Sequence, residues 1–164
     1  MNNEDKSLLV KAVVNRVVSS LADKDSNKMT LELALLLTEK VKEKAKEMGV
    51  KAVVAVTDAG ANPICVQSMD DAYIASYDIA LNKAFTVASL KMPTSALKSL
   101  AAPGGSLYGI QFTNGGKIVI FGGGVPLYGK DGSVIGGLGV SGGTEEQDTA
   151  LGDYGGEIFK SIFI

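Results

Sequence analysis

The chain has 164 residues, of which 46% are hydrophobic, and these values are typical of one domain with a single core. Its formal charge of −2 argues against nucleic-acid partners, which need a basic protein face, and we expect no signal peptide and no membrane span. A single cysteine, Cys65, cannot form an internal disulfide, so we expect a cytoplasmic protein. The chain has no histidine, which excludes Ser-His-Asp and Cys-His catalysis.

Residues 6–21 have the residue spacing of an amphipathic helix. The apolar side chains recur every three to four residues, and polar side chains lie opposite: the apolar set is Leu9, Val10, Val13, Val14, Val17, Val18 and Leu21, and the polar set is Lys11, Asn15, Arg16 and Ser19. The polar stretch that follows is typical of a tether. We therefore expect a helix with its linker at 1–24 and a single domain at 25–164.

The domain should begin with a long helix that runs from an N-cap at Thr30 to a C-cap at Gly49. Two strand-like segments, 50–57 and 63–69, flank the turn-forming run DAGAN, and this arrangement predicts a hairpin. Residues 71–90 then show helical spacing with a face of small residues. That face is suited to close contact with a sheet.

All glycines except Gly49 and Gly60 follow Pro103, so tight turns and strands should dominate the second half. After a short helix at 95–101, the predicted strands are 107–112, 117–121, 125–128 and 134–140. Asn114-Gly115 and Asp131-Gly132 are hairpin signals, and Thr144 with Gln147 predicts a capping box that opens a last helix. This order of elements predicts an α+β fold, with helices packed on an antiparallel sheet.

Two residues stand out chemically. Lys83 lies in the apolar helical stretch ALNKAFTVA, where an inward-facing cation needs an anionic partner. Such a lysine is a candidate ligand contact or acid-base group, and the alternative is that its ammonium reaches the surface. Cys65 lies in a predicted strand, where its thiolate is a candidate ligand for a metal or haem iron; the alternative is a small buried apolar residue.

Residues 137–142 match G-x-G-x-x-G, but no second parallel strand follows them, so the match does not indicate a dinucleotide site. The glycines before the last helix leave another reading open. Their backbone N–H groups are candidates for binding an anionic ligand, and helix capping explains the same residues.

Three segments in order carry a family resemblance: VTDAGANPICVQSMDDAYIASYDIALNKAFTVASLKMPT, PGGSLYGIQFTNGGKIVIFGGGVPL and GSVIGGLGVSGGTEEQD. They resemble the GlcG/HbpS family of haem-associated proteins, which includes the C-terminal domain of PduO-type proteins, over residues 29–152. The resemblance implies a profilin-like fold with a five-stranded antiparallel sheet, a homo-oligomer, and binding of haem or a related tetrapyrrole such as a corrinoid. It also implies that the chain is no cobalamin adenosyltransferase, because PduO-type proteins carry that activity in a separate domain.

These observations together predict an accessory protein that binds a small-molecule ligand. The residues expected at its pocket are Asn62, Lys83, Pro103, Gly104 and Gly105, with Cys65 as the conditional metal ligand. The alternatives for axial ligation of haem iron are Met69, a tyrosine such as Tyr73, or no side chain at all. The alternative is an enzyme that acts on a small metabolite or degrades haem, with Lys83 or a carboxylate as its acid-base group.

Residues 6–21 also resemble the encapsulation peptides of bacterial microcompartments. That resemblance implies a shell or cargo partner and a location inside a microcompartment. The alternative is that this helix packs on its own domain or across an oligomer interface, since an apolar stripe this short needs a surface to cover it.

Overall fold

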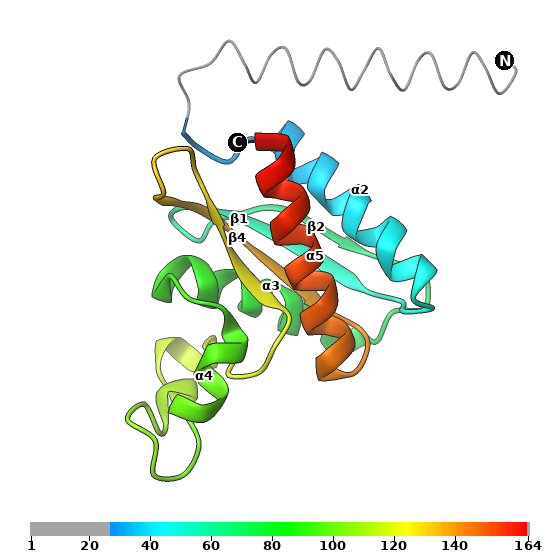
Figure 1. Cartoon of the computed structure of the whole chain (residues 1–164). Helices are drawn as coiled ribbons and strands as arrows, with labels where there is room; N and C mark the ends of the chain where they lie inside the picture. The colour runs from blue at the N-terminus through cyan, green and yellow to red at the C-terminus, as the bar shows by residue number, and fades with distance from the viewer. Residues whose placement is uncertain (1–26, 164) are drawn as a thin grey trace, which may run out of the picture.

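The computed structural model describes residues 27–163, so the predicted helix at 6–21 lies outside the described residues. Its centre is an antiparallel sheet of four strands in the order β2-β1-β4-β3. The strands are β1 (Val53–Asp58), β2 (Pro63–Ser68), β3 (Gly124–Tyr128) and β4 (Val134–Ser141). Helices α2 (Leu31–Glu47) and α5 (Glu145–Phe163) cover one face of the sheet, and α3 (Ile74–Leu90) covers the other (Figure 1).

The two faces of the sheet carry side chains of different size. Val54, Val56 and Leu138 belong to the large hydrophobic core under α2 and α5. On the opposite face, glycines of β4 let α3 come close: a Cβ added at Gly139 would lie 2.0 Å from the carbonyl oxygen of Ala80. The small-residue face predicted for this helix therefore packs directly on Gly137 and Gly139 of β4, where no side chain keeps the helix away.

Most predicted helix ends and turns are confirmed. The Thr30 hydroxyl accepts the Leu33 N–H at 3.3 Å, and Gly49 has φ +69° after the end of α2. Thr144 and Gln147 form both hydrogen bonds of the capping box, at 3.0 and 3.3 Å. The hairpins β1–β2 and β3–β4 are also present.

The predicted strands at 107–112 and 117–121 are wrong, and the sheet has four strands instead of the expected five. Short 3₁₀ helices, η1 (Ile110–Phe112) and η2 (Asn114–Gly116), occupy this region. Asn114 and Gly115 adopt the positive φ of a hairpin turn, but the flanking backbone bonds locally. In the segment 117–121, the Val119 N–H donates to the Thr86 hydroxyl of α3 instead of to a neighbouring strand.

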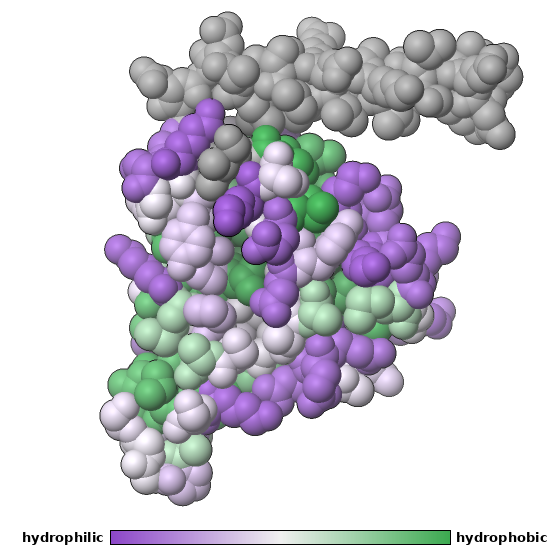
Figure 2. Space-filling model, in the orientation of Figure 1, coloured by the Kyte–Doolittle hydropathy of each residue, from purple (hydrophilic) through white to green (hydrophobic). Residues whose placement is uncertain are grey.

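The segment from α4 (Thr94–Leu100) to η2 projects from the body of the molecule (Figure 1). We call residues 101–117 the arm. Its Tyr108 and Phe112 side chains are 65% and 80% exposed, and Figure 2 shows hydrophobic surface gathered on this projection. Within residues 27–163, no helix is both long enough and apolar enough to cross a membrane.

Candidate functional site

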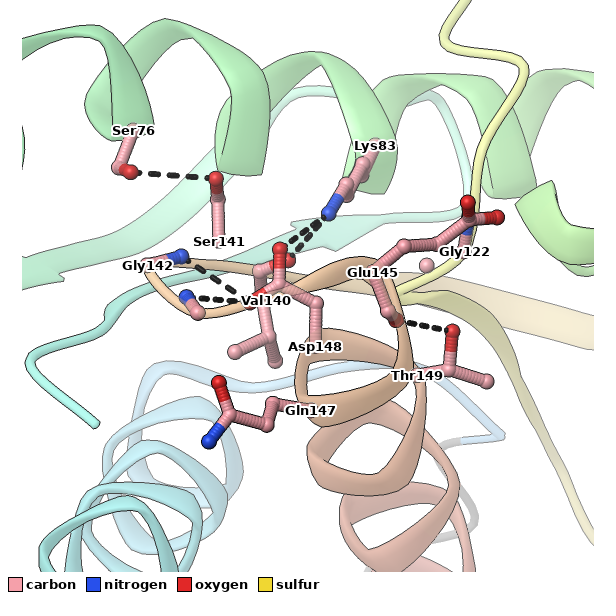
Figure 3. A network of polar contacts seen from close by, with 12 residues as sticks. Ser76, Lys83, Gly122, Val140, Ser141, Gly142, Glu145, Gln147, Asp148 and Thr149 are labelled. Carbon is pink, nitrogen blue, oxygen red and sulfur yellow. Dashed lines mark hydrogen bonds and ion pairs between the residues drawn. The ribbon is translucent and has the colours of Figure 1, made fainter. Parts of the chain in front are cut away.

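Lys83 points from α3 into the interior and is fully buried. Its ammonium donates to the Asp148 carboxylate and to the Val140 carbonyl, both at 2.8 Å (Figure 3). The same ammonium lies 4.8 Å from the centre of the Phe121 ring. Burial lowers the pKa of the Lys83 ammonium, and the Asp148 carboxylate opposes that shift. The inward orientation is thus the correct one of the two alternatives, and the partner is a carboxylate of the chain itself.

Asp148 joins three parts of the fold. Besides Lys83, its carboxylate accepts the N–H groups of Gly142 and Gly143 at 3.0 and 2.9 Å, and it comes from the first turns of α5 (Figure 3). The next N–H along, that of Thr144, donates to the Gln147 side chain. These donors are taken by the chain's own side chains, so capping explains the glycine pair and an external anion is not needed there.

A second contact ties α3 to the same strand end. The hydroxyls of Ser76 and Ser141 are 3.2 Å apart, and both residues are buried (Figure 3). The end of β4 is therefore held from α3 by Ser76 and Lys83 and from α5 by Asp148. Such a network fixes the backbone that follows β4.

An open hollow of about 530 Å³ lies against that fixed backbone, where β1 begins and β2 and β4 end. We call it the end hollow; it is lined by Gly49, Val50, Lys51, Asp71, Tyr73, Gly142, Gly143, Thr144 and Gln147. Lys51 and Asp71 form an exposed ion pair at 2.8 Å on its rim. Tyr73 is 73% exposed, and the adjoining Ile74 is 97% exposed.

The expected site residues do not meet at one place. Asn62 donates to the Asp58 carboxylate in the β1–β2 turn. Lys83 instead bonds to Val140 of β4, and the partner of Val140 on β1 is Val54, four residues before Asp58. Four residues of strand, about 13 Å, therefore separate the Asn62 turn from Lys83. Lys83 does not line the end hollow.

The turn Pro103-Gly104-Gly105 lies at the start of the arm. Gly104 has φ +86°, and a Cβ at Gly105 would lie 2.2 Å from the Leu100 carbonyl oxygen, so both glycines are needed for the backbone path itself. None of the three lines the end hollow. Their geometry accounts for the glycines without a ligand.

Cys65 is 8% exposed and belongs to the core on the α2 side of the sheet, whereas Lys83 comes from α3 on the opposite side. The Thr38 hydroxyl lies 3.8 Å from its sulfur. Met69 also packs against this core, and its sulfur accepts the Ala52 N–H at 3.3 Å. Among the described residues, no group of three or more Cys, Asp or Glu side chains is placed to hold a metal ion.

Sequence reasoning missed Asp148, Lys51 and Gln147 as parts of this region. One signal for Asp148 was present: it lies three and seven residues before Leu151 and Gly155, which helical spacing puts on the buried face of α5. No local pattern links Asp148 to Lys83, since 65 residues separate them. The end hollow is formed by residues of three loops that are far apart in the sequence. No pattern within one of these loops predicts it.

The model of the family described as "Haem degrading protein HbpS-like" matches residues 29–155. A 15.0 kDa protein of Citrobacter freundii, described as uncharacterized, is 45% identical over 82% of this chain and 94% of its own length. The corrinoid adenosyltransferase PduO of Salmonella typhimurium is 41% identical over 68% of this chain. The matched part is only 33% of PduO, so the chain spans about a third of that relative.

One solved structure is informative about ligands. A crystal structure described as a PduOC:heme complex is 35% identical to this chain, covers 79% of it and 94% of its own chain, and superposes with a TM-score of 0.76. Its description gives haem as the ligand of that protein.

Proposed function

Since the chain belongs to the HbpS-like family, we propose that it is an accessory protein that would hold haem at the end hollow, with the Tyr73 phenol as the group that would ligate the iron. The observation that carries this assignment is the position of Tyr73. Of the sulfur and phenol donors considered above, Cys65 is buried in the core, and the partly buried Met69 packs against it with its sulfur bonded to the Ala52 N–H. The Tyr73 ring, by contrast, stands on the rim of the end hollow. A tyrosine phenolate is an established type of haem ligand.

The surroundings of Tyr73 fit a flat, apolar macrocycle with acidic side groups. Ile74, the next residue along the chain, is apolar and 97% exposed, and Lys51 in the lining of the end hollow offers a cation for a propionate. Lys51 would have to exchange Asp71 for that propionate, and an exposed ion pair of this kind contributes only about 0–1 kcal/mol, so the exchange costs little. When bound, haem would supply a redox-active iron centre; the residues of the chain hold and orient it.

The enzymatic alternative assigned acid-base chemistry to Lys83. The Lys83 ammonium is fully buried, bonded to Asp148 and Val140, and absent from the lining of the end hollow. These contacts favour a structural use of Lys83 and therefore a binding role for the protein. Its relation to PduO makes a corrinoid the competing ligand.

Haemin titration of the purified protein tests this assignment. We expect a saturable Soret shift in the wild type, and at least a tenfold weaker affinity with a changed Soret position in Tyr73→Phe, since the variant loses only the phenol oxygen. Tyr108→Phe is the matched control, because Tyr108 is similarly exposed but lies on the arm. Equal spectra and affinities for wild type and Tyr73→Phe would remove Tyr73 from the account, and saturable binding of cobalamin but not haemin would assign the corrinoid instead.

We also propose that the protein acts as a homo-oligomer in which the arm contacts a second copy. The support is the exposed apolar surface of Tyr108 and Phe112 on a segment that stands away from the body. Sedimentation should show a smaller species for Phe112→Ser and an unchanged one for Leu35→Ser, which alters a 39% exposed residue of α2. A wild-type monomer at micromolar concentration would contradict the proposal.

The proposed encapsulation role of residues 6–21 concerns a segment outside the described residues and stays a prediction. Its test is the co-localisation of the full chain with a microcompartment shell, compared with a chain lacking residues 1–24. Retained co-localisation of the shortened chain would argue against it.

A further inference from the structure

An apolar groove runs along the free edge of the sheet, between β3 and α5. We call it the edge groove; it has a volume of about 430 Å³ and is lined by Pro93, Val125, Pro126, Leu127, Tyr128, Asp153, Gly156, Glu157, Phe159 and Lys160. Within residues 27–163, β3 is the last strand of the sheet and pairs only with β4, so no described strand covers this side. Hydrophobic surface is visible between the hydrophilic side chains on this face of the molecule (Figure 2).

The described part of the chain begins beside one end of this groove. Asn27 is held by the β3–β4 turn: its side-chain oxygen accepts the Lys130 N–H at 2.9 Å, and its amide donates to the Ser133 hydroxyl at 3.0 Å. Tyr128, which lines the groove, directly precedes this turn. The first described residue, Asn27, therefore lies next to the Tyr128 end of the edge groove.

We propose that the amphipathic segment 6–21 docks in the edge groove of its own chain, as a helix with its apolar stripe against β3 and α5. The distances allow this. Residues 22–26 span up to about 17 Å when extended, which is enough to bring the end of the segment from Asn27 to Tyr128. The groove is about 10 Å long from Val125 to Tyr128, or about two helical turns, which matches the stripe of Val10, Val13, Val14 and Val17.

The charges on the two surfaces are complementary in the same orientation. Gly152 lies against Gly123, and a Cβ at Gly156 would lie 3.5 Å from Val125, so α5 runs parallel to β3. Exposed Asp153 and Glu157 follow each other along the rim toward the Tyr128 end. A segment that approaches from Asn27 runs in the same direction as α5, so Arg16, near its C-terminal end, is placed at the level of Glu157.

Thiol accessibility tests the docking in the full-length chain. In a Cys65→Ala background, we expect the thiol of Val13→Cys to be alkylated at least tenfold more slowly than in a free peptide of residues 1–26, and the thiol of Asn15→Cys, on the polar face, at the peptide rate. Added Gly156→Leu should fill the groove and restore fast alkylation of Val13→Cys, because Gly156 lines the groove and a Cβ there has room, 3.5 Å from Val125. Ser161→Leu, on the same helix but outside the groove, is the control and should change nothing.

A charge exchange provides a second, independent reading. Glu157→Lys should accelerate alkylation of Val13→Cys several-fold, and Arg16→Glu in the same chain should reverse the effect. Fast alkylation of Val13→Cys in the otherwise unchanged protein, or protection that survives Gly156→Leu, would overturn the proposal.

Disulfide trapping between Val17→Cys and Tyr128→Cys identifies the occupant. We expect a cross-link within one chain that does not depend on protein concentration. A predominant cross-link between two chains would overturn the assignment to the same chain and make a second copy the source of the segment.

Discussion

At the scale of single residues, the ion pair of Lys83 and Asp148 is the least ordinary feature of the interior. Both side chains are almost fully buried, and each also bonds to backbone groups at the end of β4. A buried pair is weak evidence for stability in itself, but the removal of one partner leaves the other charge without compensation. The pair also fixes the glycines that form one wall of the end hollow.

We predict that Lys83→Met lowers the free energy of unfolding by about 3–5 kcal/mol at neutral pH, because the Asp148 carboxylate then stays buried without a cation. Urea denaturation of both proteins at neutral pH measures this difference. Lys46→Met, at an exposed position of α2, is the control; equal stability of Lys83→Met and Lys46→Met would contradict the prediction.

Only part of the site could be predicted at this scale. Lys83 stood out because a lysine in an apolar helical stretch requires an anion, and the structure supplies one. The identity of that anion depends on the packing of α5 against the sheet, which no local pattern encodes. Asn62 and the glycines at 104 and 105 carried turn signals, and turn geometry proved sufficient to explain them.

At the scale of elements, the contact between α3 and β4 defines the architecture. Gly137 and Gly139 of β4 lie under the carbonyls of Ala84 and Ala80, at distances that leave no room for a Cβ. Since backbone meets backbone there, the helix cannot shift without displacing the strand end that carries Val140 and Ser141.

A pair of glycine substitutions tests this contact. Gly139→Ala should destabilise the fold by about 1–3 kcal/mol or more through overpacking, because its Cβ would overlap the Ala80 carbonyl oxygen. Gly156→Ala should be neutral or stabilise by about 0.5–1 kcal/mol, because that Cβ has room in the middle of α5. Thermal denaturation compares the two variants, and a Gly139→Ala protein as stable as the wild type would show that α3 can move away.

The sequence predicted the elements well where one local rule decided the outcome. Thr30 caps the start of α2, and Gly49 and Gly132 adopt the positive φ that a helix end and a tight turn require. The ends of α2 and the β3–β4 hairpin were therefore predicted correctly. The Asn114-Gly115 turn followed the same rule, with positive φ at both residues, yet no strands flank it. The residues on either side of this turn form hydrogen bonds within the arm and to Thr86 of α3. Such tertiary contacts cannot be predicted from the turn-forming residues alone.

At the scale of the whole molecule, two recesses lie in different parts of the fold. The end hollow gathers three loops around Tyr73, and the polar network of Lys83 and Asp148 supports it from behind. The edge groove lies along β3, next to the point where the described chain begins. Ligand binding at one and docking of the N-terminal segment at the other are therefore separable.

The central claim is that the end hollow holds the tetrapyrrole. Amide hydrogen exchange with and without haemin tests it most directly, because exchange reports where backbone groups become protected. The account predicts that haemin slows exchange in the peptides that contain residues 49–51, 71–77 and 142–147 and leaves those of β3 and the arm unchanged. Protection confined to β3, the arm or the Cys65 strand, with no change around Tyr73, would contradict it.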